Sequence, residues 1–375
     1  MSASLHDTLS LFDPDLPLER AHTIPALWYS DPALHAAECR SVFGGTWQAV
    51  GRIDQVREPG QFFTAEVAGE PLVVVRGDDG ELRAFFNVCR HRAARVMADV
   101  EGRATRLRCR YHGWTYDLCG RLRGTPEFDG VADFRREDNG LPPVAVAVWG
   151  PIVWVHLGTH QQPLADYLAP LPDRAAALKL DSLHFVARRE YRLECNWKIF
   201  VDNYLDGGYH VNTVHPGLAG VLDYAQYRTE IAGNTAVQIS PIRPSEEGAV
   251  GGVRAGENAY YWWVFPNVML NVYEGVMDTN LVLPLGPDAC RVVFDFYFRN
   301  TDGPAAEAFI ARSREVAHQI QLEDVGICEE VQRGLRSRSF DTGRFSVRRE
   351  AAGYHFHRLL ARQLRRGAAS FSGAG

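Results

Sequence analysis

Two short stretches of the chain each combine a cysteine with a histidine. One residue separates Cys89 from His91, and two residues separate Cys109 from His112. Each pair can supply one thiolate and one imidazole from a tight loop, so two such loops can close over a cluster of two irons and two sulfides. Two cysteines and two histidines can also surround a zinc ion. Zinc loops usually pair cysteine with cysteine and histidine with histidine, which favours the iron–sulfur interpretation.

The second of these stretches continues into a longer motif. Residues 109–114 read C-R-Y-H-G-W, and with the first pair they resemble the C-x-H and C-x-Y-H-G-W motifs of Rieske proteins. The resemblance implies a [2Fe-2S] cluster with both sulfurs on one iron and both imidazoles on the other. Neutral imidazoles in place of two thiolates favour the reduced cluster, so it can accept an electron and pass it on. The four expected ligands are Cys89, His91, Cys109 and His112.

A second candidate metal site lies further along the chain. His210 and His215 are five residues apart. On a straight α-helix their side chains would point about 140° apart around the axis, so both can bind one metal only if the helix ends or bulges between them. Four residues that continue a helix poorly predict such a break: Val211, Thr213, Val214 and Pro216.

A carboxylate able to complete this site lies in a helical pattern at 314–335. Iron that activates oxygen usually takes two histidines and one carboxylate on one face and leaves the opposite positions open. Asp324 falls near the centre of an apolar stripe, and Glu323 falls nearer its edge. A carboxylate on a core-facing stripe needs a partner, which is either iron or an arginine such as Arg333 or Arg336. The stripe consists of Val316, Ile320, Ile327, Val331 and Leu335.

The segment that holds both histidines resembles the catalytic domain of Rieske non-haem iron oxygenases. Residues 196–210 read N-W-K-I-F-V-D-N-Y-L-D-G-G-Y-H, and residues 321–324 with Cys328 and Glu329 resemble the third-ligand segment of that family. The resemblance implies a catalytic alpha subunit, a mono- or dioxygenase that binds mononuclear Fe(II). The implied iron ligands are His210, His215 and Asp324.

In this family the cluster of one subunit reduces the iron of its neighbour in a homotrimeric ring, through a carboxylate that bridges histidine to histidine. By resemblance, His112 would touch that acid and His210 would receive the electron. The commoner pattern places the acid three residues before the first iron histidine, where this chain has Gly207. A bulge there would restore the contact from Asp206, and Asp202 is the next candidate. The candidate catalytic residues are Asp206 and Asn203.

Other features of the sequence limit the partners and the location. The chain has no glycine-rich fingerprint for flavin or nicotinamide, so electrons for O2 and a small-molecule substrate would come from a separate ferredoxin or reductase. The net charge of −6 argues against nucleic acid. The longest uncharged apolar stretch, 141–157, is interrupted by proline and glycine and is too short to cross a membrane. Residues 1–20 show no signal or transit pattern, which predicts the cytoplasm.

The length of 375 residues predicts two domains. Short β-patterned runs fill residues 46–156 and predict a small all-β domain. Strands followed by helices, without regular βαβ alternation, predict an α+β domain whose antiparallel sheet is covered by helices. The expected divisions are 1–44, an N-terminal segment that packs with the catalytic domain; 45–160, the Rieske domain; and 161–375, the catalytic domain. The expected catalytic elements are a strand at 184–193, a helix at 196–210, a Gly-rich mobile loop at 246–258, strands within 259–299 and a helix at 304–335.

Three segments are similar to those of choline monooxygenases: 202–211, 276–287 and 331–335. This similarity implies a quaternary ammonium substrate such as choline. Such a cation donates no hydrogen bonds and is attracted by aromatic faces. A strand would place Tyr261, Trp263 and Phe265 on one face, and with Tyr273 they are the candidate substrate residues. Core packing is the alternative explanation for this aromatic strand.

Two other functions remain open from the sequence. A hydroxylase or demethylase of an aromatic or natural-product substrate would keep every metal residue and differ only in its pocket. A Rieske electron-transfer protein without catalysis would need the cluster alone. The second set of candidate ligands, His210, His215 and Asp324, argues against that simpler function.

Overall fold

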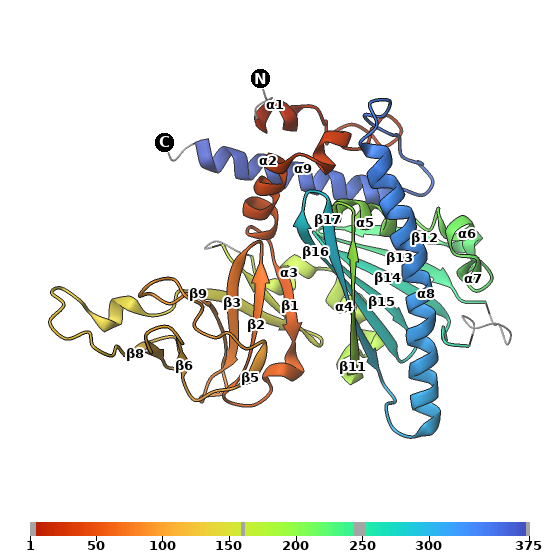
Figure 1. The fold of residues 1–375 in the computed structure, drawn as a ribbon. Coiled ribbons are helices and arrows are strands. Elements are labelled where there is room, and N and C mark those ends of the chain that lie inside the picture. The colour runs from red at the N-terminus through yellow and green to blue at the C-terminus, as the bar shows by residue number, and fades with distance from the viewer. Residues whose placement is uncertain (1–4, 159–161, 244–251, 373–375) are drawn as a thin grey trace. The chain divides into compact units, whose positions relative to one another are not determined.

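The computed structural model describes residues 5–158, 162–243 and 252–372 (Figure 1). The chain divides into two compact units, one of residues 43–165 and one of residues 1–42 with 166–375. Part of the Gly-rich loop expected at 246–258 lies outside the described residues. No helix within the described ranges combines the length and apolar character needed to cross a membrane.

The unit of residues 43–165 is built from antiparallel strands, which confirms the expected all-β domain. A seven-stranded sheet has the order β1-β10-β9-β4-β3-β2-β5, and a small sheet has the order β6-β7-β8. Two 3-10 helices, η3 (Ile53–Val56) and η4 (Arg136–Asn139), join the strands. The strands are β1 (Gln48–Arg52), β2 (Gln61–Val67), β3 (Glu70–Arg76), β4 (Leu82–Phe86), β5 (Glu101–Arg103), β6 (Leu107–Arg108), β7 (Thr115–Tyr116), β8 (Leu122–Gly124), β9 (Pro143–Trp149) and β10 (Ile152–His156).

The larger unit contains a second seven-stranded antiparallel sheet, in the order β11-β17-β16-β15-β14-β13-β12. From β12 to β17, each strand pairs with the next strand along the chain, and β11 lies beside β17 at the edge of the sheet. The α+β class expected for the chain is therefore confirmed. The strands are β11 (His184–Leu193), β12 (Arg228–Ala232), β13 (Thr235–Pro241), β14 (Asn258–Val264), β15 (Val268–Tyr273), β16 (Val276–Gly286) and β17 (Ala289–Phe298).

Helices pack against this second sheet. Within the larger unit, α5 and α8 contact each other, α5 contacts β16 and β17, and α8 contacts β11 (Figure 1). The helices are α1 (Leu5–Ser10), η1 (Ala26–Tyr29), α2 (Pro32–Ala37), the π-helix η2 (Glu38–Phe43), α3 (Leu164–Leu168), α4 (Leu171–Ala175), η5 (Ala176–Leu178), η6 (Leu180–Ser182), α5 (Trp197–Tyr204), α6 (Val211–Val214), α7 (Pro216–Ala219), η7 (Tyr224–Gln226), α8 (Pro304–Leu335) and α9 (Ala351–Ser372).

The helix expected at 196–210 is shorter than predicted. Asn196 caps α5 by accepting a hydrogen bond from the Lys198 N–H, but the helix ends at Tyr204. Gly207 and Gly208 follow with φ of 69° and 71°, in the left-handed region that a helix excludes. A Cβ at Gly207 would lie 2.1 Å from the carbonyl oxygen of Arg349, so this turn requires glycine.

The predicted apolar stripe of α8 is only partly buried. Val316 is buried, but Ile327 and Val331 are 38% and 43% exposed. The buried face of α8 lies to one side of the stripe and contains small and polar residues. A pattern of large apolar side chains therefore does not reveal it. Its buried residues are Ile310, Ser313, Ala317, Gln321, Cys328 and Gln332.

Candidate metal centres and substrate pocket

The two Cys–His pairs lie in two tight loops of the all-β unit. The Ala93 N–H donates to the Cys89 carbonyl at 3.0 Å, and the Gly113 N–H donates to the Cys109 carbonyl at 3.1 Å. Gly113 closes the second loop with φ of 75°, which explains a glycine directly after His112. Both cysteines are buried, whereas His112 is exposed. The loops therefore hold two buried sulfurs, with His112 at the surface and His91 half-buried.

The surroundings of these four side chains fit an iron–sulfur cluster. The rings of His91 and His112 lie 4.6 Å apart, and His91 stacks on Trp114. The buried His91 Nδ1 has no hydrogen-bond partner among the described residues, and an orphaned buried nitrogen of this kind fits a bound group. In the described part of the chain, the one set of three donors within 4.8 Å of each other lies elsewhere.

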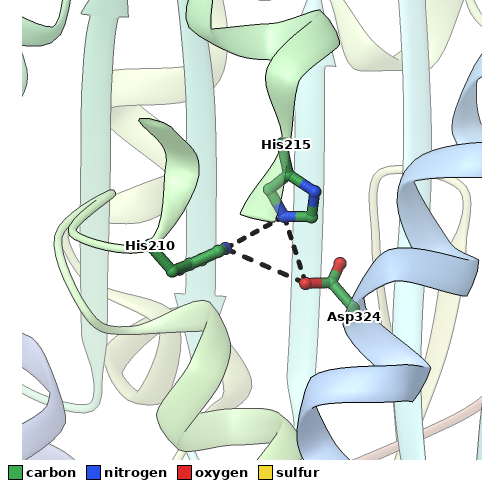
Figure 2. A group of neighbouring side chains, drawn as sticks. All are labelled: His210, His215 and Asp324. Atoms are coloured by element: carbon green, nitrogen blue, oxygen red, sulfur yellow. Dashed lines mark hydrogen bonds and ion pairs between the residues drawn. The ribbon is translucent and has the colours of Figure 1, made fainter. Parts of the chain in front are cut away.

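That set of three is His210, His215 and Asp324 (Figure 2). His210 precedes α6, and His215 follows its end directly before Pro216, the first residue of α7. The predicted helix break between the histidines is confirmed. Figure 2 shows both rings turned toward the Asp324 carboxylate, which comes from α8. The two Nε2 atoms are 3.0 Å apart, and they lie 3.8 and 3.2 Å from Asp324 Oδ1.

A carboxylate holds the outer nitrogen of each histidine. Asp206 Oδ2 lies 2.5 Å from His210 Nδ1, and Glu323 Oε2 lies 2.7 Å from His215 Nδ1. Each contact favours a proton on Nδ1, so both Nε2 lone pairs are free to face the centre. Burial lowers the pKa of His215, but the carboxylates of Asp324 and Glu323 outweigh burial, and the net pKa is raised. A cation at the centre would relieve the close approach of two lone pairs and a carboxylate.

The neighbouring acids therefore occupy different places. Asp324 faces the inner nitrogens and accepts a hydrogen bond from Asn203 Nδ2 at 2.7 Å. Glu323 faces the outer nitrogen of His215, a position that neighbouring sequence letters alone do not reveal. The alternative partners of Asp324 are engaged elsewhere, since Arg333 pairs with Glu330 and Arg336 with Asp288. The turn at Gly207 and Gly208 brings the Asp206 carboxylate to the His210 ring. The same carboxylate accepts hydrogen bonds from the backbone N–H groups of Tyr209 and His210.

A cavity of about 100 Å³ adjoins this centre and is lined by His210, His215 and Asp324. Tyrosines form much of the remaining wall. The Tyr227 and Tyr261 rings lie nearly parallel with centroids 6.4 Å apart, and the Tyr261 and Tyr273 hydroxyls are 3.1 Å apart. The wall also contains polar side chains that sequence reasoning missed: Arg254, Asn271, Asp278, Asn280 and Gln321.

Two of the four candidate substrate residues are placed elsewhere. Tyr261 and Tyr273 line the cavity, but Trp263 and Phe265 are not among the described residues of its wall. Both pack on Phe356 of α9, with ring centroids 5.8 and 6.4 Å apart, respectively. The strand alternation is correct, but β14 continues past the cavity into the core. For these two rings, the contacts agree with the alternative explanation, core packing.

Comparison with known proteins describes both halves of the chain. The Rieske [2Fe-2S] domain family matches residues 46–135, and the ring hydroxylating alpha subunit (catalytic domain) family matches residues 180–366. The chain is 44% identical to the chloroplastic choline monooxygenase of Arabidopsis thaliana, over 94% of this chain and 86% of that protein. It is 31% identical to the carnitine monooxygenase oxygenase subunit of Escherichia coli K12, over 92% and 94%. The solved structure of the quaternary ammonium Rieske monooxygenase CntA with L-carnitine gives a TM-score of 0.80 at 27% identity, covering 97% of this chain and 99% of that one.

Proposed function

This chain belongs to the Rieske ring-hydroxylating oxygenases, and from that premise we propose that it oxygenates a small quaternary ammonium compound. Choline is the example of such a compound that the similarity to choline monooxygenase suggests. As a member it is a Rieske non-haem iron oxygenase with a [2Fe-2S] cluster and a mononuclear iron. The observation that carries the substrate proposal is the group of tyrosines beside the three-donor centre: Tyr204, Tyr227, Tyr261 and Tyr273.

The metal ligands form the first part of the proposal. Cys89, His91, Cys109 and His112 would hold the cluster, and His210, His215 and Asp324 would hold the iron. When bound, the iron supplies oxygen activation from a two-histidine, one-carboxylate face.

Three further side chains would keep the iron ligands in place. Asp206 and Glu323 fix the tautomers of the histidines to which they are bonded. Asn203 fixes the Asp324 carboxylate by donating a hydrogen bond to Oδ1.

The tyrosines would position the substrate. A trimethylammonium group is attracted to ring faces, and the attraction is stronger where water is excluded. Tyr227 and Tyr261 present nearly parallel rings, and Tyr273 meets Tyr261 edge to face. The Tyr273 hydroxyl donates a hydrogen bond to the Tyr261 hydroxyl. The ring faces of these tyrosines, rather than their hydroxyls, are therefore left for the ligand.

Electrons would arrive from a ferredoxin or reductase and cross between subunits of a homotrimer. A surface groove beside Asp206 is lined by the acids Asp202, Asp206 and Glu350 together with exposed Ile327 and Phe340. The cluster loops carry exposed arginines, so their charge complements such a groove on a second copy. The arginines are Arg90, Arg92, Arg95, Arg108 and Arg110.

The test uses the full chain loaded with cluster and iron and supplied with a reductase and a ferredoxin. We expect substrate-dependent O2 consumption and an oxygenated product with quaternary amines from a panel that also contains aromatic acids. Product from the aromatic acids alone would contradict the proposal and favour a different substrate class. Cluster reduction with no turnover of any compound would favour an electron-transfer protein.

A further inference from the structure

A buried arginine lines the same cavity. Arg254 is 5% exposed, and a guanidinium carries five N–H donors that need acceptors once water is removed. Its Nε has no hydrogen-bond partner among the described residues. Its ion pair with Asp278 spans 3.9 Å from Nη1 to Oδ2, too long for a hydrogen bond. Within the described residues, the guanidinium Nε is therefore left without an acceptor.

Other buried donors of the cavity wall also lack acceptors. Two further buried donors in its wall, Asn280 Nδ2 and Gln321 Nε2, also lack partners in the described part of the chain. Two acceptors of the wall are already used, since Asn271 Nδ2 donates to Asp278 Oδ1 at 2.7 Å and to Asn280 Oδ1 at 3.1 Å. Buried donors without partners are rare in native proteins. A ligand that brings acceptor oxygens into this cavity would satisfy these donors.

A series of ring contacts leads from Arg254 toward the segment that carries His210. The guanidinium carbon of Arg254 lies 4.3 Å from the ring centroid of Tyr273. The Tyr273 hydroxyl is hydrogen-bonded to the Tyr261 hydroxyl, and the Tyr261 ring stacks on the Tyr227 ring. The Tyr227 ring packs under Gly208, two residues before His210. Three tyrosines thus link the guanidinium by contacts to the segment that leads into His210.

The backbone beside Arg254 is held by α8. Arg312 donates to the Gly252 carbonyl at 3.0 Å, close to Arg254 in the chain. Arg312 lies twelve residues before Asp324, which is about 18 Å along a helix axis.

The guanidinium also changes what the tyrosine faces can accept. It already occupies one face of Tyr273, so a ligand that carries only a positive charge would meet a like charge there, which is unfavourable in a buried site. A ligand with a carboxylate at that end would replace the repulsion by a charge-assisted, bidentate hydrogen bond. Asp278 competes weakly for the guanidinium, because its Oδ2 lies 3.9 Å from Nη1, beyond hydrogen-bond distance.

We propose that Arg254 forms an anion subsite and that the substrate is a trimethylammonium carboxylate, with the carboxylate on Arg254 and the ammonium group over the tyrosine faces toward the iron. This inference rests on the proposed function and narrows its substrate class. Choline, which has a hydroxyl in place of the acid, is then the weaker ligand. Arg254 is a specificity-determining residue that touches the substrate at its non-reacting end.

The experiment measures binding by calorimetry under anaerobic conditions with the full chain loaded with cluster and iron. The probes are matched pairs: trimethylglycine with choline, and 4-(trimethylammonio)butanoate with the corresponding alcohol. In at least one pair we expect the carboxylate to bind at least about tenfold more tightly, the effect of a buried charge-assisted pair. Arg254→Gln should remove most of that preference and change the Kd of the alcohol by less than about threefold. Arg312→Gln, which disturbs the same loop from its exposed side, should leave the preference intact.

Two results would overturn the inference alone. Alcohols that bind and react as well as the acids in the wild type would show that no anion subsite operates, while the quaternary ammonium proposal stands. Equal weakening of both members of a pair by Arg254→Gln would assign the arginine a structural role. If the variant does not fold, the wild-type comparison decides. Failure of every quaternary amine to bind, with binding of aromatic acids, would remove the proposed function as well.

Discussion

Replacement of Asp206 by asparagine tests the connection between the two metal centres. The carboxylate accepts the backbone N–H groups of Tyr209 and His210 and contacts His210 Nδ1 at 2.5 Å. Asparagine keeps one carbonyl oxygen for the backbone donors but removes the negative charge beside the ring. A hydrogen bond to a charged group contributes about 1.5–3 kcal/mol, and each 1.4 kcal/mol is about a tenfold factor. We therefore expect electron transfer to slow about ten- to hundredfold while both metals stay bound.

The measurement is rapid mixing of the reduced enzyme with substrate and O2, followed at the cluster absorbance. We expect Asp206→Asn to be reduced normally and reoxidised slowly, with unchanged iron and sulfide content. Asp202→Asn is the matched control, because Asp202 lines the same groove but bonds to Tyr29 and His357 instead of an iron histidine. Unchanged reoxidation in Asp206→Asn would refute the reasoning, and slowing in the Asp202 variant alone would move the path to that acid.

Three further predictions concern the positions of single side chains. Glu323→Gln should weaken iron retention about ten- to hundredfold in a chelator competition, because the carboxylate hydrogen-bonded to a ligating histidine is lost. Glu330→Gln, on the exposed side of α8, should leave iron retention unchanged, and equal retention in the two variants would contradict the role of Glu323. Gly207→Ala should lower the stability by at least about 1–3 kcal/mol in thermal unfolding, because it strains a left-handed residue and drives a Cβ toward the Arg349 carbonyl; an unchanged Tm would disprove this. Tyr261→Leu should raise the Kd of a quaternary ammonium ligand about tenfold through loss of a ring face, and an unchanged Kd would place the cation elsewhere.

Local chemistry made part of the site predictable from the sequence. The spacing of the Cys–His pairs fixes how tight each loop must be, and the helix break before His215 follows from Pro216 and the β-branched residues before it. Asp324 was separable from Glu323 because adjacent positions on a helix point about 100° apart. The structure places Asp324 beside the inner nitrogens of His210 and His215.

The missed features depend on packing between distant segments. Trp263 lies two residues after Tyr261 and so shares its face of the strand. Whether a ring on that face lines the cavity or packs on α9 depends on where along β14 the cavity ends. The buried face of α8 was misjudged because Gln321 and Gln332 are buried there while Ile327 is exposed. Arg254 gave no signal, since its importance comes from the missing acceptors around it.

The same limit applies at the turn before His210. Two consecutive glycines indicated a bulge that could bring Asp206 to the ring. Only the structure shows that the helix has already ended at Tyr204 and that the contact is made through the turn.

The most direct test of the central claim, that one chain holds a two-iron cluster and a separate mononuclear iron, is a joint measurement of iron and acid-labile sulfide in the wild type and in His215→Ala. His215 is 2% exposed and contributes to the inner donor set without belonging to the cluster loops. We expect the wild type to hold one iron beyond the two of its cluster, and the variant to lose that iron while sulfide content and the visible spectrum stay unchanged. Zinc without labile sulfide in the wild type, or loss of sulfide in the variant, would contradict the claim.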